Sequence, residues 1–399
     1  MKKTEQQKQI LFLTPRLPFP IIGGDKLKAY YTIKHLAEKH KVTLVSFFQG
    51  DQNKRDSYVE EIRKLGVEVF VIPLYPVKAA ISIIPRLLKA PLEILYYTQK
   101  KYRKIVDELL KERDFDIAFS FFMRSAEYIK SADLKKVLMC EDCRTLYQKR
   151  SWENSTNFVQ KIVRKWEYNR LKVYEPEIVN HFDVVTLVTN DDINEMRKQN
   201  PAPCYKLLTN GADISKFFPL ENKDWTQRTI LFAGKLDVWA NVLMTKKIVG
   251  EIFPIIKAKV PDAKLQIVGA NPPKSLLMLR DKDIQVVANV PDMLPYLQQA
   301  NLFLHPHSGG SGIQNKLLEA MAAGCPVVTT KTGNQGIEAK NNEEVLLAND
   351  SAELAERAIE ILSSEDFARK IASNARQLIE RKHSWEIIFS QIDDIIQNL

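Results

Sequence analysis

Short apolar runs alternate with longer amphipathic stretches through the first half of the chain. An apolar run at 10–14 is followed by a helical pattern over 25–39 and by a second apolar run at 42–48. Such alternation is typical of βαβ units, whose strands are parallel. It therefore predicts that residues 1–208 form a doubly wound parallel-sheet domain. Further strands are expected at 67–72, 116–121, 136–140 and 182–188.

A second series of the same kind begins after a polar stretch at 209–228, which predicts an interdomain linker. The series predicts a second doubly wound domain over 229–380, in agreement with a chain of 399 residues. Helices alone are expected over 352–399, with the last one, 381–399, packing back on the N-terminal domain. The strands of the second domain are expected at 229–233, 264–268, 284–287, 302–305 and 327–329, with a helix over 242–257.

The composition is that of a globular protein, and it bears on the cellular compartment in which the protein resides. Hydrophobic residues make up 45% of the sequence and charged residues 27%. No run of 18 uncharged apolar residues and no signal-peptide pattern is present. Four cysteines are too few and too dispersed for a disulfide framework. We therefore expect a cytoplasmic protein.

The net charge of +9 lies in the first half of the chain. Residues 1–180 hold 34 Lys and Arg against 22 Asp and Glu, which leaves 24 against 27 for the rest. A basic surface attracts nucleic acids, anionic membranes and phosphorylated substrates alike. No nucleic-acid-binding motif accompanies it, so no nucleic acid partner is expected. The mainly helical stretch 77–112 mixes cations with aliphatic residues; it fits a membrane surface or an ordinary solvated face.

Open α/β sheets bind ligands in the loops that follow their strands, and the first such loop is rich in proline and glycine. It ends in Gly23, Gly24, Asp25 and Lys26 at the start of a helix. Glycines allow a backbone to approach a phosphate, and a helix start favours negative charge. A plain turn capped by Asp25 explains the same residues.

Two loops of the second domain carry further candidates. Lys235 follows the strand at 229–233, where it could pair with a diphosphate or could be merely solvated. A glycine loop after the strand at 302–305 leads into a helix that carries Lys316 and Glu319 three positions apart. Lys316 could hold a phosphate and Glu319 could accept hydrogen bonds from two ribose hydroxyls, although the two could equally form a surface pair.

Other polar residues give weaker signals. Glu141 and Asp142 follow a predicted strand, where a carboxylate could orient an acceptor hydroxyl or cap a turn. The pair Cys140 and Cys143 has metal-like spacing but stands alone. His305 and His307 have no third ligand nearby in the sequence. No metal site is expected.

The run from Gly309 to Val328 resembles the donor-binding signature of retaining GT-B glycosyltransferases of family 4. That signature is E-x7-E followed by A-M-A-x-G-x-P-V-V, and Glu319 matches its second glutamate. Residues 209–219 resemble the family's N-G-V-D…F-x-P segment, and 232–236 resemble F-x-G-R-L. The resemblance covers most of the chain. The variants G-I-Q-N-K-x-x-E-A-M-A, at 312–322, and G-D-K, at 24–26, look most like those of sugar transferases associated with bacterial exopolysaccharide clusters.

The sequence departs from the family pattern at three places. Ser311 stands where the family has its first glutamate, which contacts the donor sugar. Ala240 and Asn241 replace the K-G of R-L-x-x-x-K-G, so that Lys316 could take over part of the missing cation's role. The segment 116–124 lacks the histidine that many relatives carry.

The resemblance implies an α/β protein of the GT-B fold, with two Rossmann-like domains facing a central cleft. It implies a retaining, metal-independent transfer of sugar from a nucleotide-sugar, with no other cofactor, to a glycan or polyprenyl-linked acceptor, in bacterial surface polysaccharide or glycoconjugate synthesis. Asp25, Lys26, Glu141 and Asp142 are the acceptor-side candidates. An anionic membrane on its inner face is a possible further partner. A non-catalytic nucleotide-sugar-binding or scaffold protein is the alternative. The expected donor-binding residues are Gly23, Gly24, Lys235, His307, Gly312, Gln314, Asn315, Lys316 and Glu319, among which Glu319, Lys316 and Lys235 carry catalysis.

Overall fold

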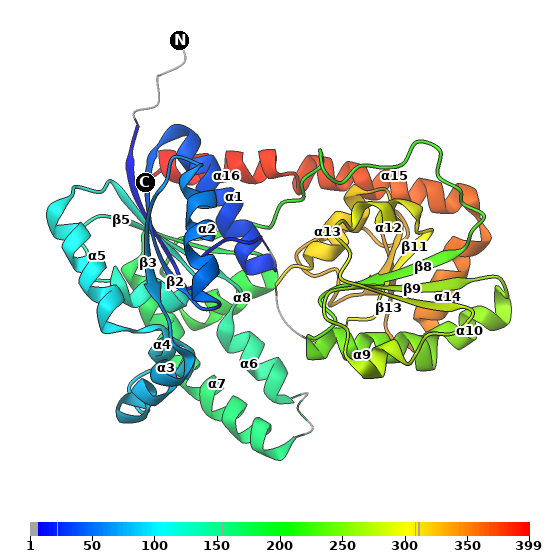
Figure 1. The fold of residues 1–399 in the computed structure, drawn as a ribbon, viewed down its shortest axis with the longest axis horizontal. Coiled ribbons are helices and arrows are strands. Elements are labelled where there is room, and N and C mark those ends of the chain that lie inside the picture. Colours follow the sequence, from blue (N-terminus) through cyan, green and yellow to red (C-terminus); the bar gives the residue numbers. More distant parts are fainter. Residues whose placement is uncertain (1–6, 22, 154, 156, 308, 310–311) are drawn as a thin grey trace, which may run out of the picture. The chain divides into compact units, whose positions relative to one another are not determined.

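A computed structural model describes residues 7–399 apart from 22, 154, 156, 308, 310 and 311, and the side chain of Asp25 is not described either. The chain divides into two compact units. The N-terminal unit comprises Met1–Leu208 together with Phe389–Leu399, and the C-terminal unit comprises Thr209–Ile388. Figure 1 shows a sheet with accompanying helices in each unit.

The N-terminal unit is built on a seven-stranded parallel sheet with the order β3-β2-β1-β4-β5-β6-β7. The first six positions repeat the 3-2-1-4-5-6 order of Rossmann-like folds. All predicted strands of this unit are present, whereas β7, three residues long, was not predicted because so short a run has no clear periodicity. The strands are β1 Gln9–Thr14, β2 Lys41–Phe48, β3 Glu68–Pro73, β4 Ile117–Phe121, β5 Lys135–Glu141, β6 Val184–Leu187 and β7 Tyr205–Leu207.

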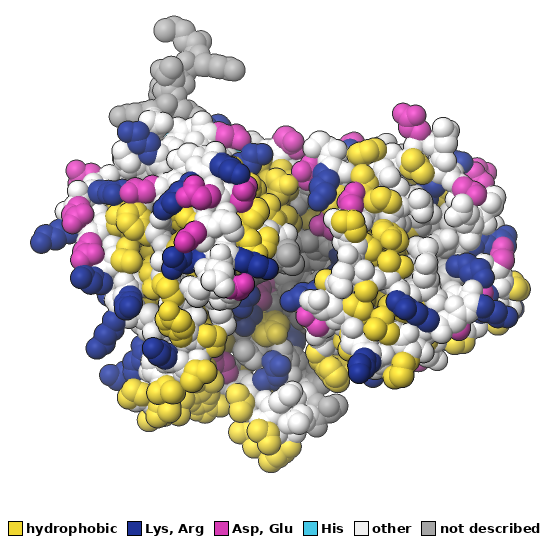
Figure 2. Space-filling model, in the orientation of Figure 1, with side chains coloured by type: hydrophobic (Ala, Val, Ile, Leu, Met, Phe, Trp, Pro, Cys, Tyr) yellow, Lys and Arg dark blue, Asp and Glu magenta, His cyan; other side chains and the backbone are white. Residues whose placement is uncertain are grey.

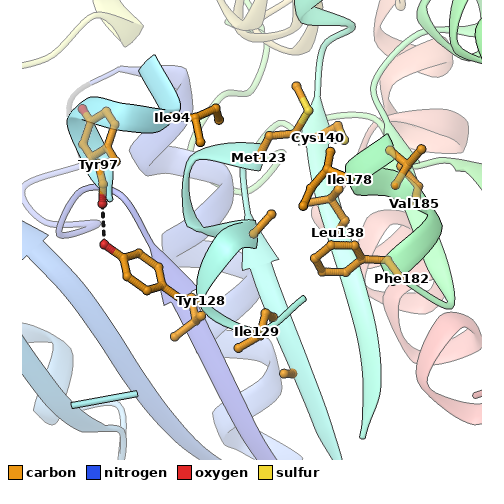
Figure 3. Close-up of a cluster of buried hydrophobic side chains, with 14 of the residues drawn as sticks. Ile94, Tyr97, Met123, Tyr128, Ile129, Leu138, Cys140, Ile178, Phe182 and Val185 are labelled. Carbon is orange, nitrogen blue, oxygen red and sulfur yellow. Dashed lines mark hydrogen bonds between the residues drawn. The ribbon is translucent and has the colours of Figure 1, made fainter. Parts of the chain in front are cut away.

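Helices follow these strands and enclose an apolar core. Figure 3 shows part of that core, in which Ile94 and Tyr97 lie near Met123 and Tyr128, and the Tyr128 hydroxyl donates to the Tyr97 carbonyl. The helices are α1 Gly24–Lys39, α2 Gln52–Arg63, α3 Pro76–Ile83, η1 Ile84–Arg86, α4 Leu92–Tyr97, α5 Lys100–Glu112, η2 Met123–Tyr128, α6 Arg144–Glu153, α7 Phe158–Ile178, η3 Val179–His181 and α8 Asn190–Gln199.

The C-terminal unit has a six-stranded parallel sheet with the order β10-β9-β8-β11-β12-β13, again the Rossmann-like order. Five of its strands were predicted. The sixth, β13, has three residues and was not. The strands are β8 Thr229–Ala233, β9 Lys264–Gly269, β10 Ile284–Ala288, β11 Leu302–His305, β12 Val327–Thr330 and β13 Leu346–Ala348.

The helix predicted over 242–257 is a helical run broken by one π turn, η4 Ile248–Ile252. Pro254 lies two residues after the end of this turn, and a proline removes one backbone donor from a helix. The helices of this unit are α9 Trp239–Lys247, α10 Phe253–Lys259, α11 Lys274–Leu277, α12 Leu294–Gln299, α13 Asn315–Ala322, α14 Ser351–Ser363, α15 Glu365–Lys382 and α16 Trp385–Gln397, whose last part belongs to the N-terminal unit.

The stretch 209–228, expected as a linker, is part of the C-terminal unit. Ala212 and Phe217 are buried in its core, and the Arg376 guanidinium donates to the Phe217 carbonyl at 2.6 Å. At Gly211, a Cβ would lie 2.5 Å from the Trp385 ring, so the segment packs against the start of α16 as only glycine allows.

The terminal helix α16 belongs to both units: its residues up to Ile388 are part of the C-terminal unit, and those from Phe389 on are part of the N-terminal unit. From there to the C-terminus it contacts α1 of the N-terminal unit: the Phe389 ring stacks on His35 with centroids 4.3 Å apart, and Lys39 donates to Asp393 at 2.6 Å. No helix in the described part of the chain is long and apolar enough to cross a membrane.

Candidate functional site

The strand order reverses between β8 and β11 in the C-terminal sheet, which places the loops after these two strands side by side. Ligands of doubly wound sheets bind at such reversal points, beyond the carboxyl ends of the strands. The loop after β8 carries Lys235, and the loop after β11 leads to α13 with Lys316 and Glu319. The fold therefore gathers the second domain's candidates at one sheet edge.

Asn241 joins these two loops. Its side-chain oxygen accepts a hydrogen bond from the Lys316 ammonium at 2.8 Å, and its side-chain nitrogen donates to the Lys235 carbonyl at 2.8 Å. The Lys316 ammonium also lies 5.6 Å from the centroid of the Phe232 ring. The backbone of Lys316 belongs to α13, but its ammonium group is thus held over the end of β8. Lys235 itself points outward, with half of its side chain exposed and Asp237 at 3.7 Å.

Glycines bring the backbone close together beside Lys316. A Cβ at Gly269 would lie 1.7 Å from the Gly234 carbonyl oxygen, and a Cβ at Gly234 would lie 3.1 Å from the Lys316 ammonium. Any side chain at Gly269 would push the loops after β8 and β9 apart, so these two positions keep the cation in place.

The start of α13 presents backbone donors. Gly312 has φ +79°, a conformation that favours glycine, and Gln314 at the N-cap makes no side-chain capping hydrogen bond. Asn315 is held from the neighbouring segment, since the Asn210 amide donates to its side-chain oxygen at 2.7 Å. A helix start without a side-chain cap favours an anion.

Burial governs the ionisation of this cluster. Burial lowers the pKa of Lys316 to about 8, against an opposing effect of Glu319. Burial raises the pKa of Glu319 to about 7, although Lys216 and Lys316 favour its charged form. No side chain that the structure describes lies within ion-pair distance of the Glu319 carboxylate. Among the described side chains, therefore, no carboxylate forms an ion pair with Lys316 and no cation forms one with Glu319.

His307 lies beside this cluster but is not a free contact group. Its ring is buried and stacks on His305 with centroids 5.3 Å apart, and its carbonyl accepts from the Thr330 hydroxyl at 2.5 Å. Burial lowers the pKa of His307 to about 4, with Lys316 acting in the same direction. The imidazole is neutral at physiological pH.

In the N-terminal unit, the glycine loop and the strand-end acids are connected by a buried lysine. Lys28, on the first turns of α1, pairs with Glu141 at 2.8 Å and donates to the Leu208 carbonyl at 2.6 Å. Glu141 has φ +70°, uncommon for a residue other than glycine, at the carboxyl end of β5. Burial lowers the pKa of Lys28, while the Glu141 carboxylate acts against that effect.

The N-terminal unit also holds two donor-binding candidates, Gly23 and Gly24, and three further acceptor-side candidates, Asp25, Lys26 and Asp142. Gly23 precedes α1 with φ +100° and is exposed, as is Gly24. Asp142 pairs with Arg144 at 3.2 Å. The side chain of Asp25 and the whole of Ser311 lie outside the described residues, and Lys26 has interaction partners.

One part of the chain matches a known domain family. Residues 227–364 match the family model described as "Glycosyl transferases group 1". This stretch contains Lys235, Asn241, Lys316 and Glu319. Residues 227–364 are a group 1 glycosyltransferase domain.

Relatives of this glycosyltransferase domain extend the likeness to the whole chain. An "Uncharacterized 44.6 kDa protein in cps region" of Klebsiella pneumoniae is 22% identical over 96% of this chain and 98% of its own length. The "Capsular polysaccharide biosynthesis glycosyltransferase CapM" of Staphylococcus aureus is 25% identical over 36% of this chain and 40% of its own. The Anabaena protein HepE, solved with UDP and glucose, superposes with a TM-score of 0.68 at 16% identity, covering 98% of this chain and 100% of HepE. The GT-B fold expected from the sequence is confirmed.

Two residues of the site were missed by sequence reasoning. Asn241 was noticed only as a departure from the glycosyltransferase pattern. The departure was itself a signal, because Asn241 brings a side chain to a position where the pattern has glycine. Lys28 gave no signal, because it follows the glycine loop as one lysine of several. Cys140 and Cys143 are both buried, and among the described residues no three His, Cys, Asp or Glu side chains are grouped to hold a metal ion.

Proposed function

We propose that this protein is a retaining glycosyltransferase that uses a nucleoside diphosphate sugar as donor and needs no bound metal. One observation carries the proposal: Asn241 holds the Lys316 ammonium over the end of β8, one helical turn from the unpaired carboxylate of Glu319. A nucleoside diphosphate would supply what both groups lack, with phosphate oxygens for the cation and ribose hydroxyls for the carboxylate.

The proposed donor site uses the backbone as well as side chains. The amides of Gly312, Gln314 and Asn315 at the start of α13 would bind the diphosphate together with Lys316, and Lys235 could swing onto it because its side chain is half exposed. His307 would support the wall of the site. Gly23 and Gly24, at the start of α1, remain the phosphate-binding candidates of the N-terminal unit.

Charge stabilisation then accounts for the transfer. As the bond between the anomeric carbon and the phosphate oxygen breaks, negative charge grows on the diphosphate, where Lys316 and the helix start lie ready to stabilise it. The acceptor oxygen bonds to the anomeric carbon on the same face, and its proton passes to the departing phosphate oxygen. No protein nucleophile is needed.

For the acceptor, we propose a glycan or a polyprenyl-linked saccharide handled in the cytoplasm during surface polysaccharide synthesis. The likenesses to CapM and to the Klebsiella protein of a cps region support this role, and the HepE complex supports a nucleotide-sugar donor. Asp25, Lys26 and Asp142 remain the acceptor-side candidates. Glu141 would act there mainly through its ion pair with Lys28.

A ligand screen tests the donor site. The purified protein and its Glu319→Ala variant are melted with UDP, GDP, ADP, CMP and their common sugar conjugates. A ligand at about 100 times its Kd stabilises a fold by about 2.7 kcal/mol, which shifts the melting temperature visibly. We expect one nucleotide family to stabilise the wild type and not the variant. If no nucleotide shifts a well-folded protein, the scaffold alternative replaces the transferase.

A further inference from the structure

Two neighbouring helical segments of the N-terminal unit expose aliphatic side chains to solvent. The first, α3 with η1 and the residues up to Lys89, buries only Ala79. The second is the first half of α7, whose buried residues begin at Glu167. The exposed fractions in the first segment are Val77 71%, Ile81 59%, Ile84 71%, Leu87 41% and Leu88 82%; those in the second are Phe158 76%, Val159 68%, Ile162 53% and Val163 48%.

Hydrogen bonds fix these segments to each other and to the core, so that their exposed apolar side chains stand on ordered helices. The Arg170 guanidinium on α7 donates to the Ala90 carbonyl at 2.9 Å, and the Glu167 carboxylate accepts from the Leu92 amide at 3.1 Å. Arg86 ties η1 to the end of α4 through the Leu95 and Thr98 carbonyls. Ile94 and Tyr97 then hold α4 in the core seen in Figure 3.

A pocket of about 480 Å³ lies beside the exposed half of α7, lined by residues of α4, α6 and α7. Val159 and Val163 of α7 and Leu92 of α4 form its apolar wall, and its charged lining residues are Glu93, Arg144, Arg164 and Glu167. Figure 2 shows hydrophobic side chains gathered at the end of the unit where Figure 1 places α3 and the α6–α7 pair. We name the exposed aliphatic side chains of the two segments together the α3/α7 surface.

The charge on this surface selects its partner. No acidic residue occurs from Pro76 to Leu92 or from Asn157 to Trp166. Lysines stand among the aliphatic residues on both segments and are exposed: Lys78, Lys89, Lys161 and Lys165. The acids next to these stretches, Glu93 and Glu167, are largely buried, so that the exposed charges among the aliphatic side chains are lysines. Such a surface matches the interface of an anionic bilayer, where lysines meet lipid phosphates and aliphatic groups enter the acyl boundary.

We propose that the α3/α7 surface docks this protein onto an anionic lipid bilayer. The inference deepens the proposed function, since it rests on an acceptor carried by a membrane lipid, and it names the face that meets the membrane. Phe158, Ile162, Ile84 and Leu88 enter the boundary between headgroups and acyl chains, and the four lysines contact phosphates.

Vesicle sedimentation with the full-length protein tests the docking. The wild type is mixed with vesicles of phosphatidylcholine alone or with about one third phosphatidylglycerol. We expect binding to the anionic vesicles only. The variant Ile84→Ser/Leu88→Ser/Phe158→Ser/Ile162→Ser should lower the partition coefficient more than about tenfold. Each lysine replaced by glutamine should lower it about fivefold at low salt.

Matched controls separate docking from general stickiness and misfolding. Val173→Ser, at a 74% exposed position further along α7, and Met278→Ser, at a 77% exposed position of the C-terminal unit, should bind vesicles like the wild type. A Leu88→Trp variant should show a blue-shifted emission with anionic vesicles. Far-UV circular dichroism melts of every variant establish that it folds.

The outcomes distinguish this proposal from the others. Absence of wild-type binding to anionic vesicles, or equal binding by the serine variant, would overturn it. Sedimentation velocity without lipid showing a dimer that the serine variant loses would instead make the surface an interface between copies. Nucleotide-induced melting shifts in the same variants report on the donor site separately, so either function can fail while the other stands.

Discussion

Asn241 offers the sharpest test of how the donor site works. Replacing it with alanine removes the acceptor of the Lys316 ammonium and the donor to the Lys235 carbonyl, both at 2.8 Å. Hydrogen bonds to charged groups contribute about 1.5–3 kcal/mol. The low end of that range, with water entering in part, corresponds to about one pKa unit.

As a consequence, the Lys316 ammonium should lose its proton at a lower pH in the variant. The pKa of Lys316 is about 8 in the wild type, and we expect about 7 in Asn241→Ala. At pH 7.5 the charged fraction would then fall from about three quarters to about one quarter. Diphosphate affinity should fall about threefold from charge alone, and by about tenfold in total once the ammonium is no longer positioned.

Calorimetric titration with UDP from pH 6.5 to 9 measures this directly. Affinity should decline with rising pH in both proteins, with a midpoint about one unit lower in Asn241→Ala. Leu243→Ala, at a partly exposed position of the same helix, should match the wild type. The reasoning is wrong if the midpoint stays in place in Asn241→Ala, or if Lys316→Met retains the alkaline decline.

Three further predictions follow from the same contacts. Burial holds the pKa of Glu319 at about 7, above the usual 4.5, so its contribution to stability is full below pH 4.5 and is lost as the pH rises through 7; the melting temperature of Glu319→Gln relative to wild type should therefore rise across that window. Lys28→Met removes the buried cation that pairs with Glu141 at 2.8 Å and should cost about 3–5 kcal/mol in urea unfolding, and Lys28→Met/Glu141→Gln should recover much of it, whereas no recovery would count against the ion pair. Gly269→Ala forces a Cβ to within 1.7 Å of the Gly234 carbonyl and should lower stability by about 1–3 kcal/mol together with UDP affinity, while Gly250→Ala, where a Cβ meets open space, should lower neither.

The alternation of apolar runs predicted the sheets well, because parallel strands are buried on both faces and their sequences stay apolar throughout. The two strands that escaped prediction, β7 and β13, have three residues each and lie at sheet edges, where a strand needs neither length nor full burial. The segment 209–228 was misjudged for a related reason. Its polar composition hides the few buried side chains, such as Phe217, that fix it to the C-terminal unit.

For the candidate site, the sequence predicted which side chains gather but not how they are held. Lys316 and Glu319 could be paired from their spacing on one helix, since spacing fixes the helical face. That Lys316 turns to Asn241 instead of Glu319 depends on a contact across 75 positions of the chain, which no local pattern encodes. The two residues of the Lys28–Glu141 pair lie still farther apart in the sequence.

Two carboxylates of the long helix α7 occupy the N-termini of neighbouring helices. Its Glu167 accepts from the first amides of α4, and its Glu175 accepts from the Arg144 and Thr145 amides at the start of α6. Both helix starts are therefore occupied by carboxylates of the protein itself, and a phosphate would have to displace a buried acid to bind there. The start of α13 has no side-chain cap of this kind from Gln314. Because carboxylates of the protein already fill these two helix starts, an anion meets competition there that Gln314 does not offer at the start of α13.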